Sequence, residues 1–244
     1  MRLDKFLVEC GIGSRTEVKK ILGNGQVKVN GVITKSSKEQ IDEIKDKITC
    51  KNEELEYKEF RYYVMHKPSG YITAIDDYRE KTVMEVLPEW VIRKDLFPVG
   101  RLDKDTEGLL LFTRNGKIND ALTKPGNCIK VYEVWVRGHV TDEHIIDALA
   151  GLESIHGLLK AKVTRIGNGG AKTKLRVELE EGKNRHIRRL FGALKDPKFG
   201  TPLKVLELNR ISIGSFKPNI EIGKWRYLSI DEEKMLIKRA IKVV

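Results

Sequence analysis

Residues 100–113, GRLDKDTEGLLLFT, join a dense run of charged residues to an uninterrupted apolar run. The apolar residues 109–112 are bounded by Gly108 on one side and by an Arg-Asn-Gly turn on the other. A short apolar run with such boundaries is typical of a fully buried strand, and the charged residues before it are expected to form the loop that enters the strand. Because loops on a rigid scaffold often carry functional groups, this loop is the first candidate for a site.

Three acidic residues of this loop, Asp103, Asp105 and Glu107, allow three interpretations. With Gly108 they match the first half of a helix-loop-helix calcium site. However, the bidentate Glu that should end such a site is replaced by Arg114, and the flanking residues resemble strands. Two carboxylates in different environments could also serve a glycosidase. Considered without any resemblance, three acids in a polar loop favour a solvated turn.

The charge balance of the chain favours a polyanionic partner. Lys and Arg number 46 against 35 Asp and Glu in 244 residues, which gives a net charge of +11, and the sequence pI is about 9.4. Nucleic acid is therefore the first candidate partner. The hydrophobic fraction of 40% is sufficient for one large domain or two unequal ones.

The three cysteines, Cys10, Cys50 and Cys128, are far apart and odd in number, so the sequence predicts neither a disulfide framework nor a zinc site. No apolar run approaches the ~20 residues of a membrane span, and the N-terminus lacks the apolar core of an export signal. We expect a cytoplasmic protein with no membrane partner and no bound metal.

Residues 1–38 are expected to form two short basic helices followed by a hairpin. Apolar residues recur at helical spacing within residues 3–10, and Ser14 with Glu17 forms the capping box of a second helix. An Asn-Gly turn then predicts a hairpin within residues 26–33.

The charge of this part of the chain changes along the sequence. Residues 1–38 hold eight basic and three acidic residues, whereas residues 39–59 hold eight acidic residues and four Lys, as in a polar connector. Taken alone, the basic residues are compatible with an ordinary solvated helix face. The motifs RLDKFL, SRTEV and GQVKVNG, in this order, resemble the S4 RNA-binding domain and imply such a domain at residues 1–58. The RNA-facing residues implied by this resemblance are Arg2, Lys5, Ser14, Arg15, Lys19, Lys20 and Lys28.

Residues 59–244 are expected to form a second domain of mixed strands and helices. The clearest signal is the period-two alternation of residues 173–179, and Lys130 and Tyr132 share one face of another predicted strand. The remaining strands are predicted at residues 61–65, 71–74, 128–136 and 203–213, and helices at residues 82–87, 117–122, 141–149 and 230–240.

Four motifs in this second part resemble the Rsu/Rlu family of pseudouridine synthases. They are Gly-Arg-Leu-Asp at residues 100–103, Lys-Pro-x-Gly at residues 67–70, Lys-x-Tyr at residues 130–132 and Asn-Arg-x-aliphatic-Arg at residues 184–188. The resemblance extends over nearly the whole chain. It implies an α+β fold in which the small S4 domain precedes a catalytic domain, residues 59–244, with a mixed, largely antiparallel sheet.

The resemblance also implies a chemical role for particular residues. Pseudouridine formation detaches uracil from C1′ of its ribose and rejoins it through C5 without redox change, so no cofactor is expected. The step needs an ionised oxygen nucleophile in a dry pocket and a fixed cation beside it. The family pattern implies Asp103 as the nucleophile and Arg188 as its ionic partner, while attack at C1′, addition to C6 and abstraction of a 2′ proton all stay open.

Tyr132 would stack on the base and Ile187 would pack beneath it, and Arg101 would hold RNA or fill the space left by the extruded nucleotide. Further RNA-binding residues are expected at Lys130, Lys183 and Arg185.

The chain departs from the family pattern at three places. Asp120-Ala121 stand where many members carry His-Arg, His186 replaces a Gln, and residues 193–202 form a longer segment than usual. Residues 184–188 are closer to the form found in large-subunit enzymes than to the small-subunit form.

The predicted function is the isomerisation of a uridine in ribosomal RNA, with large-subunit RNA favoured. The alternative is a non-catalytic S4-type RNA-binding or ribosome-assembly protein. The expected partner is ribosomal RNA or a pre-ribosomal particle, bound by a monomer.

Overall fold

The computed structural model describes residues 1–57, 61–92, 95–155 and 157–241. The chain divides into two compact units, a first unit of Met1–Arg61 with Leu87–Leu96 and a second unit of Tyr62–Val86 with Phe97–Val244. The predicted boundary between residues 58 and 59 lies outside the described residues. In the described part of the chain, no helix combines the length and the apolar character that crossing a bilayer requires.

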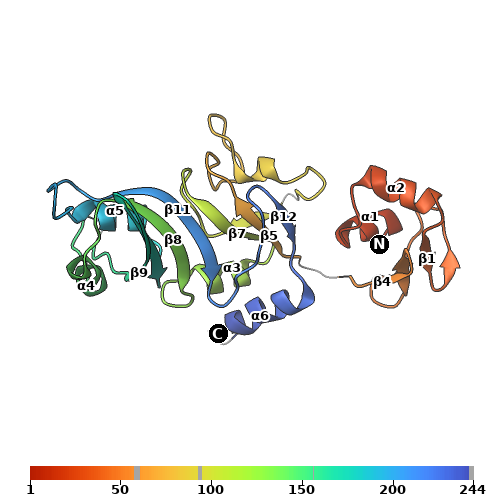
Figure 1. The fold of residues 1–244 in the computed structure, drawn as a ribbon. Helices are drawn as coiled ribbons and strands as arrows, with labels where there is room; N and C mark the ends of the chain where they lie inside the picture. Colours follow the sequence, from red (N-terminus) through yellow and green to blue (C-terminus); the bar gives the residue numbers. More distant parts are fainter. Residues whose placement is uncertain (58–60, 93–94, 156, 242–244) are drawn as a thin grey trace. The chain divides into compact units, whose positions relative to one another are not determined.

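The first unit packs two helices against a small antiparallel sheet (Figure 1). The helices are α1 (Leu3–Glu9) and α2 (Arg15–Gly23), and the sheet has the order β2 (Val32–Ile33), β1 (Val27–Val29), β3 (Ile48–Cys50) and β4 (Glu53–Leu55). The predicted capping box is confirmed: Glu17 N donates to Ser14 Oγ at 3.2 Å, and Ser14 N donates to Glu17 Oε2 at 2.7 Å. The core of this unit contains Leu3, Phe6, Leu7, Val18, Leu22, Val27 and Ile48.

The second unit is built on one mixed, largely antiparallel sheet, as predicted. Its strands follow the order β12-β5-β7-β11-β8-β10-β9, with β6 paired to β7, and the β7–β11 pair is parallel. The bounds are β5 (Tyr63–Lys67), β6 (Phe97–Val99), β7 (Glu107–Thr113), β8 (Lys130–Arg137), β9 (Lys162–Gly169), β10 (Lys172–Leu179), β11 (Lys204–Ile213) and β12 (Trp225–Tyr227). The helical elements are the 3₁₀ turn η1 (Val83–Val86), α3 (Gly116–Thr123), α4 (Asp142–Ala150), α5 (His186–Ala193) and α6 (Ile230–Ile241).

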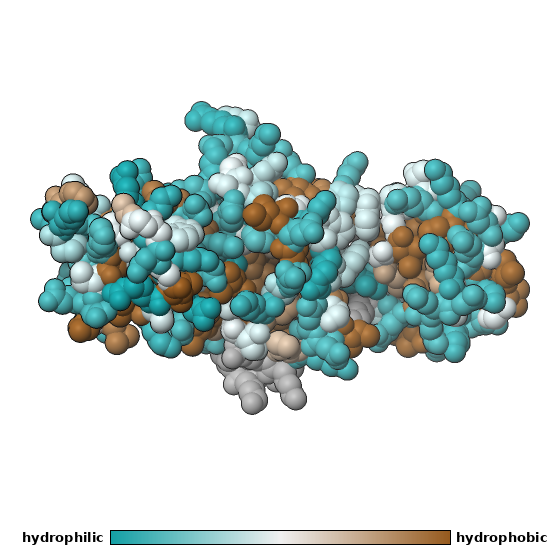
Figure 2. All heavy atoms as spheres, viewed as in Figure 1, coloured by the Kyte–Doolittle hydropathy of each residue, from teal (hydrophilic) through white to brown (hydrophobic). Residues whose placement is uncertain are grey.

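A hydrophobic core lies between α5 and the strands on which it packs. Val134 of β8 and Leu175 of β10 are fully buried, and α5 adds Ile187, Leu190 and Phe191 to the same cluster. Hydrophilic side chains (teal) cover most of the face drawn in Figure 2.

Most of the predicted elements are confirmed, and two are corrected. The buried strand after the charged loop is β7, in which residues 108–113 are all buried. The strand predicted at residues 71–74 is wrong, because Ile72 forms an isolated bridge with Thr82 and the neighbouring Thr73 uses its side chain to bind another segment. The helix predicted at residues 82–87 is a single 3₁₀ turn.

The loop that enters β7 is held by close backbone packing at Gly108. This residue has φ +110°, a conformation that disfavours any residue with a Cβ. Gly108 pairs with Arg210 of the parallel strand β11, and Arg210 Nε donates to Leu109 O at 2.8 Å. A Cβ on Gly108 would overlap the backbone O and N of Arg210. β7 and β11 can therefore meet only with a glycine at this position.

The same loop is tied to β5 by a buried ammonium group. Lys67 is fully buried, and its Nζ donates to the carbonyls of Pro68 (3.0 Å), Lys104 (3.2 Å) and Thr106 (2.7 Å). Burial lowers the pKa of this ammonium to about 8, although the charges of nearby carboxylates oppose the shift.

Gly108→Ala is expected to lower the free energy of unfolding of the second unit by about 3 kcal/mol, from backbone strain and overpacking together. Gly70→Ala is the matched control, because Gly70 also has a positive φ of +91° but a Cβ there would meet nothing within 4 Å. The control should lose only the strain, about 1–2 kcal/mol. Equal losses in urea unfolding would show that β7 and β11 do not meet as closely as described.

Lys67 is expected to make stability depend on pH in the alkaline range. Its pKa is about 8 when folded and 10.5 in the reference state, so between these values the unfolded chain binds more protons and the free energy of unfolding rises with pH. The difference in unfolding free energy between wild type and Lys67→Met should therefore grow from pH 8 to pH 10, by up to about 1.4 kcal/mol per pH unit. Lys117→Met, at an exposed position in α3, should show a flat difference in the same urea titrations. A difference that stays flat for Lys67→Met would contradict the burial of a charged group.

Candidate active site

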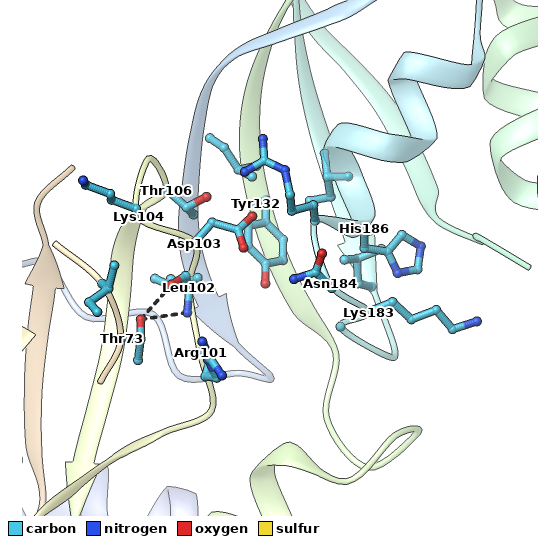
Figure 3. Close-up of a pocket in the computed structure, with 16 residues that line it drawn as sticks. Thr73, Arg101, Leu102, Asp103, Lys104, Thr106, Tyr132, Lys183, Asn184 and His186 are labelled. Carbon is cyan, nitrogen blue, oxygen red and sulfur yellow. Dashed lines mark hydrogen bonds between the residues drawn. The ribbon is translucent and has the colours of Figure 1, made fainter. Parts of the chain in front are cut away.

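A cleft of about 470 Å³ lies where the loop of residues 101–106 faces β8 and the start of α5. Asp103 and Tyr132 both line it, and the Asp103 carboxylate points toward the side of the cleft that holds the Tyr132 ring (Figure 3). Asp103 is partly buried, whereas Tyr132 is 8% exposed and belongs to the hydrophobic core. The amide of Asn184 points toward the same space. The cleft thus combines a carboxylate, an aromatic ring and a hydrogen-bonding group.

The backbone on both sides of Asp103 is fixed by hydrogen bonds. The buried hydroxyl of Thr73 donates to Leu102 O at 2.7 Å and accepts from Leu102 N at 3.0 Å. On the other side, Lys104 O accepts bonds from the Lys67 ammonium and from Gly70 N. The carboxylate of Asp103 is therefore carried by a loop whose conformation is set before any ligand arrives.

Arg188 does not form the ion pair predicted for it. Its Nη2 lies 3.1 Å from Asp105 Oδ2 and also donates to Asp105 O at 3.1 Å, so its ionic partner is Asp105 in place of Asp103. Arg185 Nη1 approaches the same carboxylate at 3.9 Å. Burial lowers the pKa of Arg188, and the charge of Asp105, then more weakly that of Asp103, opposes this shift. Arg188 therefore contacts one acid of the loop and is within electrostatic range of the other.

The other predicted site residues lie at different depths. Ile187 lines the cleft and is 3% exposed, and Arg101 lines its exposed rim. Lys183 also lines the cleft, but its ammonium donates to Leu158 O at 2.7 Å and pairs with Glu181 at 3.0 Å.

Lys130 corrects the predicted set of RNA-binding residues. It is 9% exposed, because it lies on the same face of β8 as Tyr132 and that face is turned into the core. Burial also lowers its pKa. Its position contradicts the expected contact with RNA.

Most of the residues predicted to bind RNA in the first unit are exposed to solvent, and two of them already form polar contacts within the unit. Arg15, Lys19 and Lys20 are exposed on α2. Arg2 is exposed but forms an ion pair with Asp4 at 2.6 Å, and the hydroxyl of Ser14 caps α2. Lys5 is exposed on α1, and Lys28 is partly buried on β1.

Three residues of the site were not assigned a role from the sequence. Thr73 lay in a segment predicted to be a strand, and no local pattern indicates that its hydroxyl binds a residue 29 positions away. Lys67 and Asn184 lie inside two of the motifs that resemble the family, and these motifs could have pointed to them as site residues. His186 also lines the cleft, but its ring points away from Asp103 (Figure 3), and burial lowers its pKa.

The geometry argues against a calcium site. Asp105 is engaged by Arg188, and the loop is followed by the strand β7 where a calcium motif would have a helix. Among the described residues, no three His, Cys, Asp or Glu side chains are grouped so as to hold a metal ion.

Comparisons with known proteins assign the chain to a family. The family model of RNA pseudouridylate synthases matches residues 61–193, and the S4 domain model matches residues 1–47. An uncharacterized RNA pseudouridine synthase, YtzG, of Bacillus subtilis is 34% identical over 97% of this chain and 98% of its own length. The ribosomal small subunit pseudouridine synthase A of Vibrio cholerae is 32% identical over 95% of this chain and 97% of its own length.

Two further matches extend this result. The ribosomal large subunit pseudouridine synthase B of Bacillus subtilis is 31% identical over 79% of this chain and 80% of its own length. A crystal structure of a pseudouridylate synthase superposes with a TM-score of 0.63 at 29% identity, covering 97% of this chain and 99% of that one. The chain therefore belongs to the Rsu/Rlu family of RNA pseudouridine synthases and is an isomerase with an N-terminal S4 domain.

Proposed function

We propose that this enzyme converts a uridine of ribosomal RNA to pseudouridine with Asp103 as its nucleophile. The observation that carries the proposal is the position of the Asp103 carboxylate, in a cleft that Tyr132 also lines and on a backbone fixed from both sides. The relatives named as ribosomal enzymes support RNA of the ribosome as the substrate.

The charges around the loop suit a carboxylate nucleophile. The buried ammonium of Lys67 and the guanidinium of Arg188 are both within electrostatic range of Asp103. Opposite charges attract more strongly in a partly buried site than in water, and a carboxylate is the form of an acid that attacks. We assign Arg188 the role of the fixed cation, although its hydrogen-bonded partner is Asp105.

The remaining cleft residues fit a uridine that has left its stack. The Tyr132 ring offers a face for the base, Ile187 forms an apolar floor, and Asn184 offers a donor and an acceptor to the polar edge of uracil. Arg101, at the exposed rim, is placed to contact the RNA from which the base was extruded.

The two parts of the chain would divide the work between binding and chemistry. We propose residues 1–58 as the S4 domain, which binds phosphates through its exposed Arg and Lys, and residues 59–244 as the catalytic domain. The enzyme would act as a cytoplasmic monomer without a cofactor or a metal. Large-subunit RNA is the first substrate to test, because of the form of residues 184–188. Small-subunit RNA is the second, because a small-subunit enzyme matches more of the chain than the large-subunit one does.

Asp103→Asn is expected to reduce pseudouridine formation by about a thousandfold or more, because an amide cannot act as the nucleophile. Rejoining through C5 displaces the hydrogen at that carbon, so tritium release from RNA labelled at C5 of uridine measures the reaction. Asp105→Asn is the matched control in the same loop and should lose much less. Similar losses in the two variants, or no product from wild type on any ribosomal RNA fragment, would remove Asp103 from its role.

The S4 residues can be tested in the full chain through the salt dependence of binding. Lys19→Ala combined with Lys20→Ala should weaken RNA binding and reduce the slope of log K against log salt by about 0.7 for each lost phosphate contact. Lys45→Ala is the control, because Lys45 is 84% exposed but lies in the acidic connector. An unchanged slope in the double variant would contradict the RNA-binding role of α2.

A further inference from the structure

The loop that joins α5 to β11 projects from the second unit (Figure 1), and none of its residues lines the cleft. Lys195 bridges to Pro202, Asp196 N donates to Thr201 O at 2.8 Å, and Gly200 N donates to Asp196 O at 2.8 Å. The loop therefore closes on itself over residues 195–202.

A buried carboxylate fixes the tip of this loop. Asp196 is 2% exposed, and its side chain accepts bonds from the backbone N of His139 (2.8 Å), Lys198 (2.8 Å) and Phe199 (3.1 Å). These bonds, led by the one from His139, lower the pKa of Asp196. The loop is thus held in one conformation, in which Phe199 is 62% exposed and the Lys198 ammonium lies over its ring, 5.3 Å from the centroid.

Three cations stand in a row beside this loop. Arg137 of β8 lies directly opposite Lys172 of β10 and directly opposite Lys204 of β11, and all three residues are exposed. In the described part of the chain, none of them forms an ion pair with a carboxylate. Like charges directly opposite one another destabilise a sheet, so this arrangement is unfavourable until an anion binds.

A hollow of about 670 Å³ is lined by two cations of the row and by the aromatic residue. Its lining includes Arg137, Lys204 and Phe199, and its one acidic residue, Asp196, is already satisfied by backbone N–H groups. Cations that neutralise phosphates, together with an exposed aromatic face, are the two features with which proteins bind single-stranded nucleic acid.

We propose that Phe199 and the row of Lys172, Arg137 and Lys204 form a second RNA-binding site, which takes a single-stranded segment flanking the target uridine. A base would stack on Phe199 while its phosphates contact the row. α5 begins at the cleft and ends at this loop, and its eight residues span about 12 Å, so one RNA molecule can reach both sites. The proposal rests on RNA as the substrate and extends it to a surface remote from the reacting base.

The test measures the full-length chain in two assays. Binding is measured by fluorescence anisotropy with a labelled oligouridylate of about 16 nucleotides. Activity is measured by tritium release from a ribosomal RNA transcript. Phe199→Ala should weaken binding about fivefold or more and raise KM with kcat unchanged, and Phe199→Tyr should restore both. Lys172→Ala combined with Lys204→Ala should lower the salt slope by about 0.7 for each lost contact.

Matched controls separate this site from general effects on the surface. Ile146→Ala removes an apolar side chain that is 65% exposed on α4, and Lys224→Ala removes an exposed cation remote from the loop; neither should change binding. Unchanged affinity, KM and salt slope in the Phe199 and Lys172/Lys204 variants would overturn the proposal. Loss of binding to pre-ribosomal particles without loss of binding to naked RNA would assign the surface to a protein and would also overturn it. Because the oligouridylate assay does not require catalysis, failure here is distinct from failure of the proposed reaction.

Discussion

The active site depends on a buried ammonium group that, among the described residues, no carboxylate contacts directly. Removing an ammonium from water is costly unless it is hydrogen-bonded, and Lys67 meets this demand with three backbone carbonyls. Two of these carbonyls belong to Lys104 and Thr106, in the loop that carries Asp103. The loop therefore has to adopt the conformation that presents those carbonyls to β5. In this way a polar segment without regular secondary structure becomes as well defined as the strand that follows it.

The fixed conformation of the loop also directs its two aspartates to different sides. Asp103 faces the cleft and Tyr132, whereas Asp105 faces α5 and takes up the charge of Arg188. The two carboxylates are two residues apart in sequence and share the field of Arg188, but only Asp105 pairs with it directly. One is left accessible to a substrate, and the other orders the arginines of the helix that borders the cleft. Under the proposed function, Asp103 would be the reactive acid and Asp105 a positioning acid, as in sites where neighbouring carboxylates have different environments and different roles.

Local patterns in the sequence predicted the features that depend on near neighbours. The capping box at Ser14, the alternation of β10 and the buried run of β7 were all visible, because hydrogen bonds and periodicity act over a few residues. Asp103 and Tyr132, which lie in two of the motifs, line the same cleft, as the family resemblance implied. The mixed, largely antiparallel character of the sheet agreed with the same resemblance.

What the sequence by itself determined was therefore the identity of most elements and the candidates for the residues of the site. Only the tertiary structure decided which of these residues touch. The hydroxyl of Thr73, in a segment predicted to be a strand, bonds to the backbone of Leu102 instead. The Lys130 side chain is buried, and Arg188 contacts Asp105, which is 83 positions away in the sequence. The cation row exists because the register of β8, β10 and β11 aligns three residues that are far apart along the chain. Strand register and long-range contacts are set by the packing of the whole unit, and a one-dimensional pattern contains no information on them beyond its own periodicity.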